Sequence, residues 1–191
     1  FSVWKRAQIL DGLSPKQTFD LAIIGGGITG AGVALAAALK GYSVILFDKN
    51  DFGSGTSSRS SKMIHGGLRY LQQLNVGLVR ESLSEREILL NIAPHQVYPQ
   101  QYVYPVYEYS KNNKFEVKIG LIGYDILAGS RRIDHHRMYS AESLLEAEPE
   151  ICGDQLTGGF IYYDCLVDDG RLTLNAIQTA AEYGAKAVNY T

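Results

Sequence analysis

The sequence predicts an α/β fold, and three observations support this. An apolar run over residues 19–24 leads directly into the glycine-rich segment 25–30, which reads Gly-Gly-Gly-Ile-Thr-Gly. An alanine-rich stretch follows over residues 28–40 and predicts a helix, and a second apolar run occupies residues 42–47. A strand, a glycine turn, a helix and a second strand in this order form a βαβ unit. The first part of the chain is therefore expected to be a Rossmann-like domain with a parallel sheet.

The other elements are expected from hydrophobic periodicity and from turn residues. Residues 1–13 place apolar side chains at helical spacing and end near a glycine and a proline, as a short leading helix does. Prolines within residues 98–109 favour an edge or interrupted strand, in a layer different from the first sheet. Further helices are expected over 76–91, 140–148 and 172–183, and further strands over 158–167 and 185–191. We assign the charged residues of the helix over 76–91 to its solvated face.

The segment 114–128 predicts a helix with an apolar stripe. Its apolar residues recur at helical spacing and are Phe115, Ile119, Ile122 and Ile126. Such a stripe is typical of a helix that is buried in a core or lies on a membrane surface. Three lysines flank it and would suit an anionic surface; they are Lys111, Lys114 and Lys118. Burial in the core is the favoured expectation.

Composition excludes nucleic-acid binding and predicts a globular protein. The chain has 191 residues and a formal net charge of −2, and it lacks the basic footprint that neutralises phosphates. Neither a secretory signal nor a spanning segment is recognisable, so we expect a cytoplasmic location, with peripheral contact at the inner face of the membrane as a further option. The sequence stops inside its last expected strand, which predicts a fragment of a longer protein.

Cysteines and histidines give no sign of a metal site or a disulfide. Cys152 and Cys165 lie outside any C-x-x-C motif and are expected to stay reduced. His135 and His136 are adjacent in the sequence and are not expected to face one ligand together. No metal is therefore expected.

The glycines of segment 25–30 predict a pyrophosphate-binding turn. Gly25 permits the tight turn, Gly27 lets the backbone approach the ligand, and Gly30 lets the helix pack closely on the strand. The N-terminus of the following helix offers free N–H groups and a partial positive charge. Asp48 ends the second strand about 20 residues later, where an acid accepts hydrogen bonds from the adenosine ribose. This motif alone is shared by NAD and FAD proteins of many functions.

The segment 56–71 distinguishes between these cofactors. It reads TSSRSSKMIHGGLRYL and supplies a dense run of hydroxyl donors with a lysine. These groups suit the pyrophosphate and ribityl hydroxyls of a flavin better than the compact nicotinamide, so FAD is favoured. Serines also cap helices, and that structural role is compatible with cofactor contact. Gly66 and Gly67 indicate close approach of the backbone to a planar ligand.

Arg69 and His65 are the candidates for contact with the substrate. An arginine beside such a loop can clamp a phosphate through two parallel charge-assisted hydrogen bonds. His65 stands between the groups assigned to the cofactor and those assigned to the substrate, where a base or a hydrogen-bond donor is needed. A histidine that only packs is the alternative for this position.

These motifs resemble the FAD-dependent glycerol-3-phosphate dehydrogenase and oxidase family. The resemblance covers nearly the whole chain and rests on GGGITGAGVALAAALKGYSV, DFGSGTSSRSSKMIHGGLRYL, LVRESLSEREILLNIAPH, YDILAG and YYDCLVDDGRLTLNAIQTAAEYGAKAVNY. It implies oxidation of sn-glycerol 3-phosphate at C2 to dihydroxyacetone phosphate, with hydride passing to the flavin of FAD. Electrons then leave to a membrane quinone or, in oxidase members, to oxygen.

The resemblance also implies which residues form the site. The cofactor-binding residues are Gly25, Gly27, Ile28, Thr29, Gly30, Asp48, Lys49, Thr56, Ser57, Ser58, Ser61, Lys62 and His65. The catalytic residues are His65 and Arg69, with Arg69 holding the substrate phosphate. Two positions depart from the usual pattern: Gly170 replaces an alanine, and Tyr104 replaces a leucine. Both changes concern packing more than chemistry.

The expected architecture is an FAD-binding domain of the glutathione-reductase or D-amino-acid-oxidase type, with part of a mixed-sheet substrate domain. Residues 1–94 are assigned to the FAD-binding domain, 95–165 to part of the substrate or cap domain, and 166–191 to the return of the chain to the FAD-binding domain. Two alternatives stay open: another FAD-dependent amine or 2-hydroxy-acid oxidoreductase, and a non-catalytic FAD-binding fragment. The acceptor, quinone or oxygen, and the oligomeric state are not fixed by the sequence, and a homodimer is compatible with it.

Overall fold

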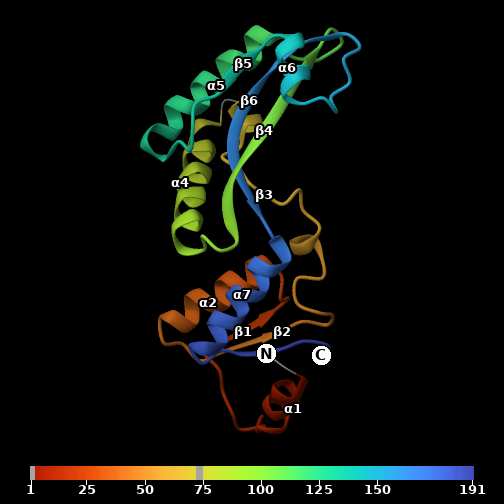
Figure 1. Cartoon of the computed structure of the whole chain (residues 1–191). Coiled ribbons are helices and arrows are strands. Elements are labelled where there is room, and N and C mark those ends of the chain that lie inside the picture. Colours follow the sequence, from red (N-terminus) through yellow and green to blue (C-terminus); the bar gives the residue numbers. More distant parts are fainter. Residues whose placement is uncertain (1–2, 72–74) are drawn as a thin grey trace. The chain divides into compact units, whose positions relative to one another are not determined.

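A computed structural model describes residues 3–71 and 75–191 of the chain (Figure 1). The chain forms two compact units: one contains the residues up to Lys62 together with Asp168–Thr191, and the other contains Met63–Val167. Residues 63–94, which the sequence analysis assigned to the FAD-binding domain, pack within the second unit.

The first unit is built on a three-stranded parallel sheet. Its strands are β1 (Leu21–Ile24), β2 (Val44–Phe47) and β7 (Lys186–Val188), in the order β1-β2-β7. The helices of this unit are α1 (Val3–Asp11), α2 (Ile28–Leu39) and α7 (Asp169–Glu182), and a 3-10 turn, η1, spans Thr56–Ser58. α2 and α7 pack against each other, and α1 contacts β7. The predicted βαβ unit is therefore confirmed.

Small side chains form the core of the first unit. α2 buries one face that consists entirely of alanines: Ala31, Ala34 and Ala38. These residues recur at helical spacing and pack with the apolar strand β2 and with Ile177 and Ala180 of α7. Because an alanine side chain is a single methyl group, α2 can lie close to both the sheet and α7. This close packing fixes where the first turn of α2 lies.

The second unit is built on a sheet whose described pairings are antiparallel. Its strands are β3 (Met63–Ile64), β4 (Val97–Tyr107), β5 (Arg137–Tyr139) and β6 (Leu156–Val167), with β3, β4 and β5 all paired to β6. Its helices are α3 (Leu68–Leu71), α4 (Val76–Ile92), α5 (Lys114–Ala128) and α6 (Ala141–Ala147), with a 3-10 turn, η2, at Gly129–Arg131. β4 and β6 run side by side as the two long strands of this unit (Figure 1).

Alternation along β6 explains how helices cover both faces of this sheet. Phe160 packs with Leu121 of α5, whereas the next residue, Ile161, packs with Leu144 of α6. Successive side chains of a strand point to opposite faces, so neighbouring residues reach different helices. β4 lies at the end of the described strand order, as its prolines predicted, but it continues through Pro99 and Pro105 without interruption.

The apolar stripe predicted for the core on α5 is exposed. Its side chains have exposed fractions of 41% to 72% and are Phe115, Ile119, Ile122 and Ile126. A different stripe of the helix faces the sheet and α4, and consists of Val117, Leu121, Tyr124 and Ala128. The preferred expectation of core burial was therefore wrong for the stripe that suggested it. Within the described residues, no helix is both long enough and apolar enough to cross a membrane.

Candidate functional site

The glycine turn between β1 and α2 has a conformation that side chains would prevent. Gly25 has a φ of +107°, in the region that favours glycine. A Cβ at Gly30 would collide with the backbone oxygen of Gly25, and a Cβ at Gly26 would collide with the Phe52 ring. Gly27 is the N-cap of α2 and has extended backbone angles. The turn is therefore folded tightly against the first turn of α2, as the fingerprint requires.

Asp48 lies beside this turn at the end of β2. One carboxylate oxygen accepts a hydrogen bond from the Gly26 N–H at 2.7 Å, and the other accepts from the Asn50 N–H at 2.8 Å. The carboxylate thus links the glycine turn to the loop that follows β2. Lys49 is exposed next to it. Contact of Asp48 with a ribose stays a prediction, but the structure places the acid beside the fingerprint.

The serine run lies next to the N-terminus of α2. Ser57 belongs to η1, and its Oγ accepts a hydrogen bond from the Ile28 N–H at 2.8 Å. Ile28 and Thr29 are exposed at the first turn of α2, and Thr56, Ser58 and Ser61 are exposed along the loop. The first N–H groups of a helix have no partner within the helix and attract anions. The fingerprint and the serine run therefore bring their donors together in one place.

Asp169 anchors the end of the serine run, and the sequence analysis did not identify it. One carboxylate oxygen accepts hydrogen bonds from the Ser60 hydroxyl at 2.7 Å and the Ser60 N–H at 3.1 Å, and the other lies 3.9 Å from the Lys62 Nζ. The Ser60 hydroxyl is the main cause that lowers the pKa of Asp169 below its usual value. Lys62 itself has a φ of +58°, in the left-handed region. Asp169 therefore holds the loop in a defined shape.

These residues of the first unit fit the pyrophosphate of a dinucleotide. A Cβ at Gly26 or Gly30 would collide with its neighbours, the N-terminus of α2 presents N–H groups, and the Ser57 hydroxyl lies beside it. A carboxylate stands close to the turn, as binding of an adenosine ribose requires.

The candidate catalytic residues belong to the second unit. His65 is exposed directly before Gly66, which is buried. Gly67 has a φ of +78° and starts the turn into α3. The backbone of Arg69 lies in α3, but its side chain lies outside the part of the chain that the structure describes. The assignment of Arg69 to a phosphate therefore stays a prediction.

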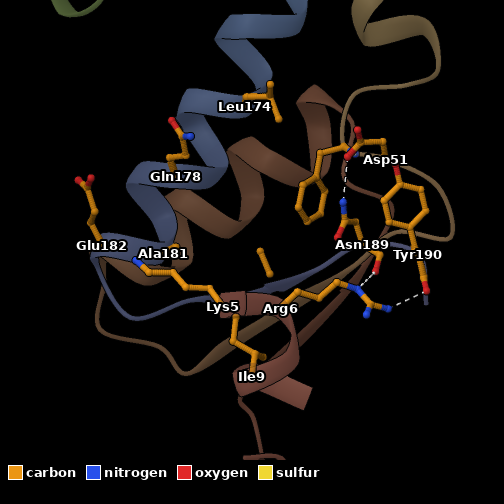
Figure 2. Close-up of a pocket in the computed structure, with 12 residues that line it drawn as sticks. Lys5, Arg6, Ile9, Asp51, Leu174, Gln178, Ala181, Glu182, Asn189 and Tyr190 are labelled. Atoms are coloured by element: carbon orange, nitrogen blue, oxygen red, sulfur yellow. Dashed lines mark hydrogen bonds between the residues drawn. The ribbon is translucent and has the colours of Figure 1, made fainter. Parts of the chain in front are cut away.

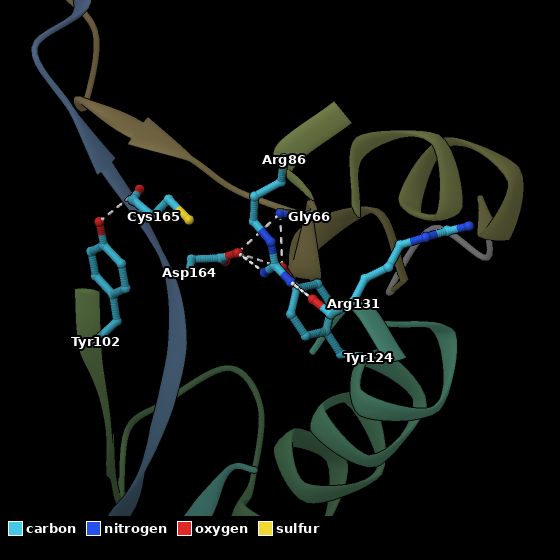
Figure 3. Close-up of polar contacts among 7 residues, drawn as sticks. All are labelled: Gly66, Arg86, Tyr102, Tyr124, Arg131, Asp164 and Cys165. Carbon is cyan, nitrogen blue, oxygen red and sulfur yellow. Dashed lines mark hydrogen bonds and ion pairs between the residues drawn. The ribbon is translucent and has the colours of Figure 1, made fainter. Parts of the chain in front are cut away.

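A buried polar network contacts this loop, and the sequence analysis missed it. Arg86 of α4 and Asp164 of β6 are each 1% exposed, and Nη1 of Arg86 lies 2.5 Å from Oδ1 of Asp164 (Figure 3). The Tyr124 hydroxyl donates to the same oxygen at 2.7 Å. The expectation that the charges of α4 are solvated was therefore wrong for Arg86. Arg86 lies at helical spacing from Val79 and Leu83, on the buried face of α4, and this spacing is the feature of the sequence that could have indicated its burial.

Asp125 shows that adjacent histidines can face one group. Nδ1 of His136 lies 2.8 Å from Oδ2 of Asp125, and Nδ1 of His135 lies 3.5 Å from the same oxygen. The two rings thus share a carboxylate neighbour, and the expectation that they do not form a metal site stays a prediction. α5 supplies the acid and the loop before β5 supplies both rings.

A cavity of about 780 Å³ lies elsewhere in the first unit (Figure 2). It is lined by residues of α1 and α7 and by those around β2 and β7, and none of them belongs to the predicted cofactor set. Arg6 of α1 reaches across and donates hydrogen bonds to the carbonyl oxygens of Asn189 at 2.8 Å and Tyr190 at 3.0 Å. These bonds attach α1 to the chain that follows β7.

Comparison with known proteins gives consistent matches. The family model described as FAD dependent oxidoreductase matches residues 20–191. An aerobic glycerol-3-phosphate dehydrogenase from Staphylococcus saprophyticus is 45% identical over 190 residues, and one from Bacillus subtilis is 44% identical over 191 residues. Each match covers 100% of this chain but 34% of the relative. The crystal structure of a glycerol-3-phosphate dehydrogenase from Bacillus halodurans complexed with FAD matches with a TM-score of 0.69 and 35% identity, over 97% of this chain and 29% of that one.

Proposed function

Because the chain belongs to the family of FAD dependent oxidoreductases, we propose that it is part of an sn-glycerol-3-phosphate dehydrogenase. Membership of this family also confirms the predicted fold class and the predicted cofactor, FAD. The reaction is oxidation of the C2 hydroxyl to give dihydroxyacetone phosphate. The observation that carries the proposal is the identity of 45% over 190 residues to an aerobic glycerol-3-phosphate dehydrogenase, a match that covers the whole chain. The chain spans about a third of the length of the curated relatives that it matches.

The first unit supplies the binding of the cofactor. The turn at Gly25–Gly30 and the first N–H groups of α2 would hold the pyrophosphate, and Asp48 would accept hydrogen bonds from the adenosine ribose. The serine run would supply hydroxyl groups along the rest of the cofactor. When bound, FAD supplies a flavin ring that takes up the hydride. The tight turn and the carboxylate at its edge support this assignment.

The second unit supplies the groups that act on the substrate. His65 would accept the proton of the C2 hydroxyl as the C2–H bond breaks, which leaves a carbonyl group at C2. Arg69 would bind the phosphate through two parallel hydrogen bonds and so orient C2. The exposed place of His65 beside a buried, glycine-rich loop supports this assignment.

We assign the final electron acceptor to the quinone class, with oxygen as the alternative. A quinone lies in the membrane, so the enzyme would need peripheral contact with the inner face of that membrane. The exposed stripe of α5, between Lys114 and Ala128, is the candidate for this contact. Oxygen uptake during turnover, compared with reduction of a water-soluble quinone analogue, distinguishes the two acceptors.

Anaerobic mixing of the full-length protein with candidate substrates tests the reaction. Loss of the flavin absorption near its long-wavelength maximum is expected with glycerol 3-phosphate, and not with proline, glycine or lactate. Bleaching by an amine or a 2-hydroxy acid instead would support one of the other oxidoreductase classes. A yellow protein that none of these compounds reduces would support a non-catalytic FAD-binding role.

A further inference from the structure

One carboxylate oxygen of the second unit accepts three donors. Oδ1 of Asp164 lies 2.5 Å from Nη1 of Arg86, 2.7 Å from the Tyr124 hydroxyl and 3.2 Å from the Gly66 N–H (Figure 3). The Gly66 N–H is also 2.7 Å from the Tyr124 hydroxyl oxygen, so it is shared between two acceptors. Tyr124 of α5 and Asp164 of β6 therefore accept from the peptide N–H that joins His65 to Gly66, and Arg86 of α4 bonds to both of these acceptors.

The loop can approach these groups closely because Gly66 has no side chain. A Cβ at this position would collide with both the Leu83 side chain and the Tyr124 hydroxyl. Only glycine allows the N–H to come within hydrogen-bond distance of Tyr124 and Asp164. Any other residue at position 66 would therefore separate this N–H from its two acceptors.

The buried ion pair between Arg86 and Asp164 is expected to add little net free energy to the stability of the core. Taking both charges out of water offsets most of their attraction, and well-packed apolar residues often serve a core as well or better. Arg86 adds a hydrogen bond from Nη2 to the carbonyl oxygen of Arg131 at 3.0 Å, which connects it to η2, the turn that follows α5. A network of this kind gives a defined geometry to the groups that it contacts.

We propose that Tyr124 and Asp164, braced by Arg86, are positioning residues that fix the His65–Gly66 peptide and thereby hold His65 in place for proton transfer. The inference rests on the proposed function for the role of His65. Neither Tyr124 nor Asp164 is assigned to contact the substrate or the cofactor.

Tyr124 is suited to this role because its hydroxyl keeps its proton. Burial and the nearby carboxylate of Asp164 both raise the pKa of Tyr124 far above its usual value. At neutral pH the hydroxyl therefore keeps its proton, so that it donates to Asp164 and accepts from the Gly66 N–H. The geometry of the loop should accordingly not depend on the titration of this group.

The first test is removal of the Tyr124 hydroxyl in the FAD-loaded full-length protein. Tyr124→Phe should accelerate hydrogen exchange at the Gly66 amide, measured by mass spectrometry on a peptide that contains it. The rate of flavin reduction at saturating glycerol 3-phosphate should fall about 10- to 100-fold, the scale expected for a displaced catalytic group. FAD content and substrate affinity should change much less.

Tyr102→Phe is the matched control. The Tyr102 hydroxyl donates to the carbonyl oxygen of Cys165, next to Asp164 on the same strand, at 3.3 Å, and it does not contact Gly66 (Figure 3). This variant should leave both measurements unchanged. Equal effects in the two variants would overturn the proposal, as would unchanged exchange at Gly66 in Tyr124→Phe. If Tyr124→Phe does not fold, Asp164→Asn combined with Arg86→Met removes the carboxylate without leaving a buried charge unpaired, and should change exchange and reduction in the same direction.

A double-mutant cycle with His65→Asn separates positioning from general stability. If Tyr124 acts through His65, Tyr124→Phe should slow flavin reduction in the wild-type background and have little further effect in the His65→Asn background. An equal decrease in both backgrounds would overturn the proposal. If glycerol 3-phosphate does not reduce the wild-type flavin, the proposed function has failed, whereas the exchange measurement needs no substrate and still decides whether the network holds the loop.

Discussion

Gly30 and Gly32 lie two residues apart in α2, but a methyl group added to each would meet different surroundings. At Gly30 it would collide with the backbone oxygen of Gly25, whereas at Gly32 nothing lies within 4 Å. Gly30→Ala should destabilise the protein by about 1 to 3 kcal/mol, because the turn must move. Gly32→Ala should leave stability unchanged or raise it by up to about 1 kcal/mol, because alanine favours the helix.

Urea unfolding and the FAD content of the purified full-length protein check these two variants. Gly30→Ala should also lose FAD, because the displaced turn is the one assigned to the pyrophosphate. Full FAD retention in Gly30→Ala, or an equal loss in Gly32→Ala, would contradict the assignment of this turn.

Arg69→Lys tests the proposed phosphate contact. Lysine keeps the positive charge but lacks the planar fork that makes two parallel hydrogen bonds. The loss of such a pair costs about 2 to 5 kcal/mol, so kcat/KM for glycerol 3-phosphate should fall by about 30-fold or more. Activity with glycerol, which has no phosphate, should change little, and so should the FAD content.

Arg80→Lys is a suitable control for this variant, since Arg80 is exposed on α4. It should affect neither substrate. If Arg69→Lys lowers kcat/KM equally for glycerol 3-phosphate and glycerol, Arg69 acts on the flavin or on the fold, and the phosphate assignment is wrong.

For single residues, prediction from the sequence succeeded where neighbouring residues in the chain explain why that residue type is needed. The glycines of the first turn follow from their spacing and their neighbours, and the structure places Asp48 and Ser57 beside them. Arg86 and Asp164 could not be paired in advance, because they are 78 residues apart and meet only through the packing of α4 on the sheet. Sequence periodicity indicates that Arg86 lies on a buried face, but it does not name the partner.

Among the elements, α5 presents the clearest test of surface contact. Ile119 and Ile122 are 54% and 41% exposed on its apolar stripe. Replacing both with glutamate should weaken binding of the full-length protein to anionic liposomes, because it removes apolar contact and adds negative charge. Co-sedimentation at constant protein and lipid concentrations measures this, and the folded state is checked by circular dichroism.

The matched control for α5 is on α4. Ile88 and Ile92 are 45% and 69% exposed there, and Ile88→Glu with Ile92→Glu introduces the same change in charge. This control should bind liposomes as the wild type does. If both double variants behave alike, the stripe of α5 has no special part in membrane contact.

The long helices of the second unit were predictable, whereas its two shortest strands were not. α4 and α5 follow from apolar spacing, and α5 begins with a capping box in which Asn113 and Glu116 exchange hydrogen bonds. β3 and β5 have two and three residues, and each exists because it pairs with β6. Segments this short carry no periodicity of their own, so only the partner strand defines them.

On the scale of the whole chain, each unit contains some of the residues proposed to bind the cofactor or the substrate. The first unit contains the fingerprint, Asp48 and the serine run, and the second contains His65 and Arg69. The chain leaves the first unit after Lys62 and returns at Asp168, where the Asp168 side chain caps α7. The serine run ends where the chain leaves the first unit, and Asp169 lies where the chain returns to it. Within this unit, the N–H and the hydroxyl of Ser60 donate hydrogen bonds to the Asp169 carboxylate.

Removal of the cofactor should lower the stability of the folded protein. A ligand that binds only the native state stabilises it by about 2.7 kcal/mol at a free concentration of 100 times its Kd. FAD added to the full-length apoprotein should therefore raise its Tm, whereas NAD at the same concentration should not. Gly27→Val should abolish the effect of FAD, because a Cβ there would lie 3.0 Å from the Ser57 Oγ and would block the approach to the turn. A Tm that rises with NAD but not with FAD would refute the flavin assignment, and an FAD effect preserved in Gly27→Val would move the pyrophosphate away from this turn.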